Sequence, residues 1–167
     1  MKIHWWRTEL LARDLRNNAV TDREGAGYMM LSAFLYTQAN YSALWFGGYR
    51  DWAFLFEALM VLLISVIGVH ECFKANGGDM GVSFLMRFCA LAVPIGVKIA
   101  VVGMALGQAV YYGFPYVVGH GTFRDAAFVY RVISVTMALT FTFVYYWRIA
   151  YHLAAIRSAL GGAEEAL

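Results

Sequence analysis

Four long apolar segments constrain the fold of this chain more than any other feature. They cover roughly residues 25–46, 53–73, 82–112 and 126–151. Each reaches the length of about 20 residues that an α-helix needs to cross the hydrocarbon core of a bilayer. The chain is 61% hydrophobic and only 14% charged, which is too apolar for a soluble domain of 167 residues. We therefore expect an all-α integral membrane protein, with a four-transmembrane-helix bundle over residues 21–157.

Residues 1–20 predict an amphipathic helix ahead of the first span. Ile3, Trp6, Leu10 and Leu11 recur at helical spacing among basic residues, and Trp5 adds a second aromatic anchor. Tryptophan is typical of the membrane–water interface. We expect this helix to lie along the cytoplasmic headgroups, and a helix packed on a partner is the alternative.

Short motifs predict where the helices begin and end. The sequence TDRE at residues 21–24 fits a capping box at the start of the first span. The sequence NGGD at 76–79 predicts a glycine turn that closes a hairpin between the second and third spans. In the tail, residues 158–167, the pair Gly161 and Gly162 is expected to end the last helix.

The distribution of basic residues predicts the orientation in the membrane. Eight Lys and Arg residues fall on the side of both termini, whereas Arg50 and Arg124 fall on the other side. Under the positive-inside rule both termini are cytoplasmic. No cleavable signal peptide is visible, so the first span is expected to direct insertion. The inner (plasma) membrane of a bacterium is the expected location.

Charged residues inside the spans each need a partner or a watery cavity. Glu57 and Glu71 share one face of the second span, and Arg87 and Lys98 share one face of the third. If the hairpin makes these spans antiparallel neighbours, Glu71 meets Arg87 and Glu57 meets Lys98. We predict this ladder of two ion pairs. A purely structural role in fixing the helix register is the plainer interpretation.

Arg131 places a further cation at the outer end of this ladder. It lies in the fourth span at the depth expected for Glu57, and Gln38 and Asn40 of the first span lie near that depth. This polar layer has a surplus of positive charge that suits an anion, a lipid phosphate or an acidic residue of a partner subunit. Extension of the Arg131 side chain to the outer headgroups is the alternative.

The third span also carries a face of small residues opposite its charges. The members of this face are Ala92, Gly96, Ala100, Gly103 and Gly107. Small residues at this spacing let two helices approach closely in a membrane. Pro94, on the charged side, is expected to kink the helix.

No catalytic, metal-binding or phosphate-binding motif is visible. His70 and His152 lie near the cytoplasmic surface on different spans and are the candidate haem ligands, although one pair is a weak signal. No other cofactor is expected. Nothing in the charge pattern favours a nucleic-acid partner.

The sequence favours a non-enzymatic membrane subunit that assembles with copies of itself or with a larger membrane complex. Its expected contacts are the lipid bilayer and an anionic lipid. The small-residue face and the lack of a catalytic motif support this hypothesis. An oligomeric channel that favours anions is the first alternative, and a haem- or quinone-binding membrane anchor is the second.

Overall fold

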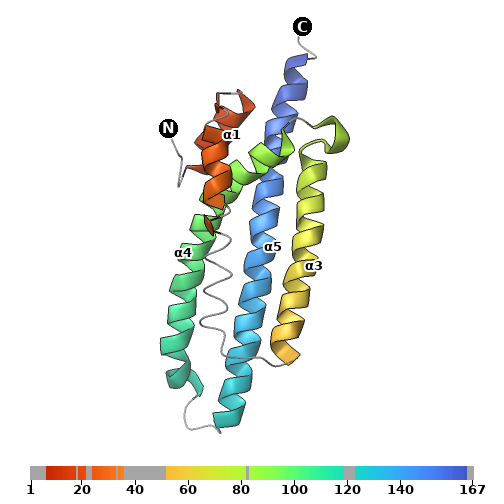
Figure 1. Cartoon of the computed structure of the whole chain (residues 1–167). Helices are drawn as coiled ribbons and strands as arrows, with labels where there is room; N and C mark the ends of the chain where they lie inside the picture. Colours follow the sequence, from red (N-terminus) through yellow and green to blue (C-terminus); the bar gives the residue numbers. More distant parts are fainter. Residues whose placement is uncertain are drawn as a thin grey trace.

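The fold is seen in a computed structural model that describes residues 7–17, 19–21, 24–32, 34–35, 52–81, 83–118 and 123–164 (Figure 1). The labelled elements are α1 (Thr8–Arg16), α3 (Trp52–Ala75), the 3-10 helix η1 (Gly78–Met80), α4 (Phe84–Val118) and α5 (Phe123–Glu164). Residues 24–32 and 34–35 are also helical. The described residues therefore form an all-helical structure.

Three helices in the described part are long and apolar enough to cross a membrane. The candidate segments are Leu55–Ala75, Phe84–Val110 and Phe128–Ser158, which fall in the second, third and fourth predicted spans. Most of the first predicted span, 25–46, lies outside the described residues. The structure thus confirms three membrane-spanning candidates, and the four-helix bundle stays a prediction.

Two helices continue well past their predicted ends. α4 runs to Val118, and α5 runs to Glu164 through the pair Gly161 and Gly162, so the expectation that this pair ends the helix is wrong. A glycine costs a helix only about 1 kcal/mol relative to alanine, and adding residues to an existing helix is far easier than nucleating one. With 42 residues, α5 is about 63 Å long, or roughly twice the hydrocarbon thickness. One end of α5 must therefore project beyond the membrane.

The capping box and the glycine turn are both confirmed. The Thr21 amide donates to Glu24 Oε2 at 3.2 Å, and the Glu24 amide donates to Thr21 Oγ1 at 3.3 Å. At the hairpin, φ is 113° at Gly77 and 58° at Gly78, in the left-handed region that glycine adopts without strain. The Gly77 amide donates to the Lys74 carbonyl at 2.9 Å, which ends α3.

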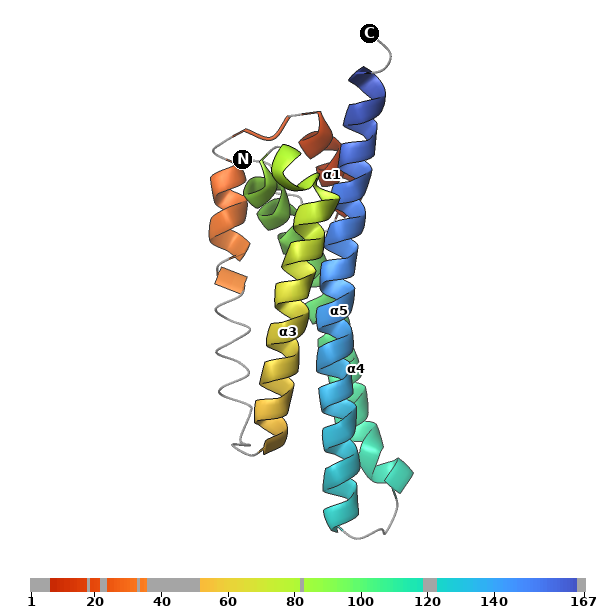
Figure 2. The same cartoon turned by 90° about the vertical axis from the view of Figure 1, so that its right-hand side faces the viewer.

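α5 is the central helix of the structure. It packs against α1, α3 and α4, and α1 also packs against α4. Figure 1 shows α5 standing between α3 and α4, and Figure 2 shows α3 beside α5 along its length. α3 and α5 run in one direction and α4 runs in the other. The hairpin therefore connects α3 to α4, but the two helices do not pack along each other.

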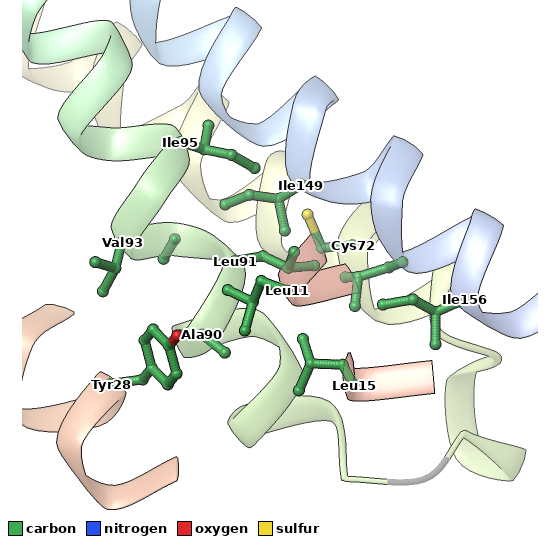
Figure 3. Packing of buried hydrophobic residues seen from close by; sticks show 12 residues of the cluster. Leu11, Leu15, Tyr28, Cys72, Ala90, Leu91, Val93, Ile95, Ile149 and Ile156 are labelled. Atoms are coloured by element: carbon green, nitrogen blue, oxygen red, sulfur yellow. The ribbon is translucent and has the colours of Figure 1, made fainter. Parts of the chain in front are cut away.

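The buried core lies at the end of the bundle that holds both termini (Figure 1). There α1 turns Leu11 and Leu15 inward, at 0% and 2% exposure, toward α4 and α5 (Figure 3). The same cluster contains Leu91 of α4 and Ile149, Leu153 and Ile156 of α5, whereas Val93 lies on the other side of α4, toward Tyr28 (Figure 3). The apolar side of α1 is therefore covered by protein. Ile3, Trp5 and Trp6 lie outside the described residues, so the interfacial role of residues 1–20 stays a prediction.

α3 and α5 approach each other closely at Gly68. A Cβ atom at this position would overlap Tyr146 Cγ and lie 2.6 Å from Tyr146 Cβ. One turn further along α3, Cys72 Sγ donates to the Tyr146 carbonyl at 3.5 Å. The absence of a side chain at Gly68 thus lets the two backbones pack closely.

We expect Gly68→Ala to destabilise the protein by about 1–3 kcal/mol, because the atoms that it meets are close to the α5 backbone and cannot simply rotate away. Gly107→Ala is the matched control, since a Cβ at that position of α4 has nothing within 4 Å. Thermal unfolding in detergent, followed by circular dichroism, measures both. Equal melting temperatures for the two variants would contradict the tight crossing.

Candidate functional site

The inner rung of the predicted ion-pair ladder is not formed. Arg87 is 4% exposed and donates from Nη1 to Asn76 Oδ1 at 3.4 Å, and Asn76 is itself 2% exposed. Glu71 instead pairs with Lys74, one turn along the same helix, with Lys74 Nζ 3.0 Å from Glu71 Oε1. The predicted pairing of Glu71 with Arg87 is therefore wrong.

The position of α5 explains this error. The first turns of α4 cross obliquely over the end of the bundle, and the rest of α4 runs beside α5 rather than beside α3 (Figure 1). Arg87 consequently reaches the hairpin turn and not the outer surface of α3, where Glu71 and Lys74 are exposed. The predicted ladder requires α3 and α4 to pack along each other, and they do not.

The outer rung also has different partners. Lys98 Nζ donates to Thr8 Oγ1 of α1 at 3.0 Å, so Lys98 belongs to the interface between α1 and α4. The charge that acts on Glu57 is that of Arg131. Arg131 of α5 therefore lies close enough to Glu57 of α3 for its charge to act on the carboxylate. Gln38 and Asn40, expected at the same depth, lie outside the described residues.

The small-residue face of α4 is divided between two environments. A Cβ at Gly96 would lie 3.7 Å from the Tyr145 ring, and one at Gly103 would lie 3.4 Å from the Phe141 ring, so both glycines face α5. Ala92 is buried in the core, at 6% exposure. Ala100 is exposed, and Gly107 has nothing within 4 Å of a Cβ. The inner part of the face thus serves contacts within the chain.

α4 bends where Pro94 interrupts its hydrogen bonds. Pro94 is fully buried, and the ribbon of α4 turns between Leu91 and Ile95 (Figure 3). Proline has no amide proton, so the carbonyl of Ala90 loses its usual helical donor. The bend directs the first turns of α4 across the core, where they cover α1.

His70 and His152 do not face each other. His70 is exposed on α3, two residues from both Gly68 and Cys72, which contact Tyr146 of α5. It therefore points away from α5. His152 is 6% exposed and belongs to the α1 side of α5. Within the described ranges, no three His, Cys, Asp or Glu side chains gather as a metal site.

A polar cavity between α1 and α5 was not predicted from the sequence. Its volume is about 360 Å³. The lining includes Glu9, Arg13 and Arg16 from α1 and Tyr151, His152 and Ile156 from α5. In the part of the chain that the structure describes, His152 Nε2 is buried without a hydrogen-bond partner. The spacing of three charged residues along one side of α1 was the sequence signal, but it did not reveal which helix faces them.

An apolar groove of about 790 Å³ lies between α3 and α5. Its lining includes Ile64, Ile67 and Gly68 from α3 and Phe143, Tyr146 and Trp147 from α5. The Glu71–Lys74 pair lines it toward the end with the termini. Tyr151 lines both the groove and the polar cavity, so the two adjoin on the surface of α5.

Comparison with protein-family models, curated proteins and solved structures finds no match to this chain. The function must therefore be argued from the geometry above.

We expect a double-mutant cycle on Asn76→Ala and Arg87→Met to give a coupling energy of about 1–3 kcal/mol, because each change removes the same buried hydrogen bond. The matched cycle on Glu71→Gln and Arg87→Met is expected to be additive. Thermal stability in nanodiscs provides the measurement. Coupling between Glu71 and Arg87, without coupling between Asn76 and Arg87, would support the predicted ion pair and refute the contact with Asn76.

Proposed function

We propose that this protein is a non-enzymatic integral membrane subunit that assembles with copies of itself through the outer half of α4. The observation that carries this proposal is the change of environment along α4. Residues 90–95 are all buried, whereas most side chains between 100 and 109 are exposed. α4 therefore leaves the protein core while it is still within its apolar segment, which ends at Val110.

Gln108 favours a second copy of the chain as the occupant. Its side chain is exposed and lies inside the apolar segment Phe84–Val110. A primary amide both donates and accepts hydrogen bonds, so two Gln108 side chains related by a two-fold axis can satisfy each other. The open space over the neighbouring Gly107 lets another helix come close. Ser134 and Thr136 of α5 need no such partner, because their hydroxyls donate to carbonyls of their own helix.

The charged residues support a structural subunit rather than the channel alternative. A conduit for anions needs cations that face its lumen. Arg87 contacts Asn76, and Lys98 contacts Thr8, so both cations are engaged inside one copy of the chain. A larger membrane complex stays the alternative assembly.

We expect Gln108→Leu and Gly107→Leu to convert the oligomer to monomer with little change in melting temperature, because Gln108 is exposed and a Cβ at Gly107 has nothing within 4 Å. Gly103→Leu is the contrasting variant and is expected to lower the melting temperature, since Gly103 faces Phe141. Native mass spectrometry of the protein released from nanodiscs gives the oligomeric state. A monomeric wild type in the same experiment would refute self-assembly.

We further propose that both termini are cytoplasmic and that the membrane is the inner membrane of a bacterium, because eight basic residues lie on that side against two on the other. Ser158 is exposed and suits a reporter cysteine, in a chain with Cys72 and Cys89 replaced by Ala. An impermeant maleimide is expected to label it after permeabilisation of the cells and not before. Labelling in intact cells would reverse the topology.

A further inference from the structure

The cavity between α1 and α5 has the chemistry of an anion site. Arg13 and Arg16 are opposed by one carboxylate, that of Glu9, so the lining carries net positive charge. Lys98 and Arg148 add positive charge near His152. Among side chains, the guanidinium group of Arg is the best suited to donate hydrogen bonds to phosphate oxygens.

His152 supplies a second and independent indication of a ligand. Its side chain is more than nine-tenths buried, it lines the cavity, and Nε2 has no hydrogen-bond partner among the described residues. A buried polar atom without a partner destabilises the folded state. An imidazole that carries a proton on Nε2 donates one hydrogen bond to an oxyanion.

The depth of the cavity matches the phosphate layer of a membrane. Trp147 is exposed on α5 and is of the residue type found at the membrane interface. The cavity-lining residues of α5 follow it by about 6–14 Å along the helix axis, toward the end with both termini; they are Tyr151, His152, Ala155 and Ile156. The candidate span Phe128–Ser158 is about 46 Å long, longer than the hydrocarbon core of about 30 Å, so its last turns can reach the level of the headgroup phosphates.

The adjoining apolar groove indicates where the phosphate comes from. The groove between α3 and α5 reaches Tyr151, which also lines the polar cavity. The Arg148 guanidinium lies 6.0 Å from the centre of the Tyr151 ring. One amphipathic molecule, with an acyl chain between α3 and α5 and its phosphate beyond Tyr151, fills both. A soluble phosphate would fill the cavity alone.

We propose that the cavity formed by Arg13, Arg16 and His152 binds the phosphate group of an anionic phospholipid whose acyl chain occupies the groove between α3 and α5. This binding requires only one copy of the chain, so it does not depend on self-assembly. Its role is to hold α1 against α5 at the membrane surface.

The test measures binding of dioleoylphosphatidylglycerol to the full-length protein in a non-ionic detergent by native mass spectrometry. Dioleoylglycerol carries the same acyl chains without phosphate and is expected not to bind detectably. We expect Arg13→Gln and His152→Gln each to weaken phosphatidylglycerol binding by about tenfold, the factor that corresponds to one charge-assisted hydrogen bond. Circular dichroism of each variant establishes that it is folded, and Arg13 is exposed, so its replacement leaves the core intact.

Arg157→Gln is the matched control. Arg157 is exposed on α5 at the same end of the bundle, outside the cavity lining, and its replacement is expected to change binding by less than about twofold. Equal losses for Arg13→Gln and Arg157→Gln would show non-specific surface attraction and overturn the proposal. Equal binding of dioleoylglycerol would overturn it as well.

Inorganic phosphate separates the two sources of the ligand. The lipid source is supported if inorganic phosphate at millimolar concentration leaves phosphatidylglycerol binding unchanged. The alternative result is that inorganic phosphate displaces the lipid from the wild-type protein but not from Arg13→Gln. That result would keep the phosphate site and overturn the lipid as its occupant.

Discussion

The packing of α5 between α3 and α4 is the arrangement on which the other contacts depend. In a membrane, apolar side chains gain little from leaving lipid for protein, so helix positions are decided by close packing and by polar contacts. Gly68 provides the close packing by letting α3 meet Tyr146 without an intervening side chain. With α5 held there, α4 can touch α3 only at the hairpin, and Arg87 comes to rest against Asn76.

The bend at Pro94 completes the core at the end with the termini. It turns the first part of α4 over the bundle, where Leu91 joins the core that contains Leu11 and Leu15 of α1. α1 is only nine residues long, and a helix of that length is marginal in water by itself. Its stability therefore comes from burial against α4 and α5, with the hydrogen bond between Thr8 and Lys98 fixing its first residue.

The sequence predicted local features well, because the local chemistry determines them. The capping box at Thr21 and Glu24, the turn at Gly77 and Gly78, and three of the apolar helices follow from short-range patterns. The partners of Glu71, Arg87 and Lys98 did not follow, because a helical wheel gives the phase of a side chain but not the helix that it faces. The cavity at His152 was hidden for the same reason, since its two walls are about 140 residues apart in the chain.

The continuity of α5 has a mechanical consequence. The contact between Gly68 and Tyr146 lies partway along a single unbroken helix, with about 35 Å of α5 on one side and about 27 Å on the other. If α5 tilts about this contact, its two ends move in opposite directions. Long transmembrane helices tilt more in a thinner bilayer. Because α1 packs on the C-terminal half of α5, a tilt that follows a change in bilayer thickness carries α1 along with that end of the helix.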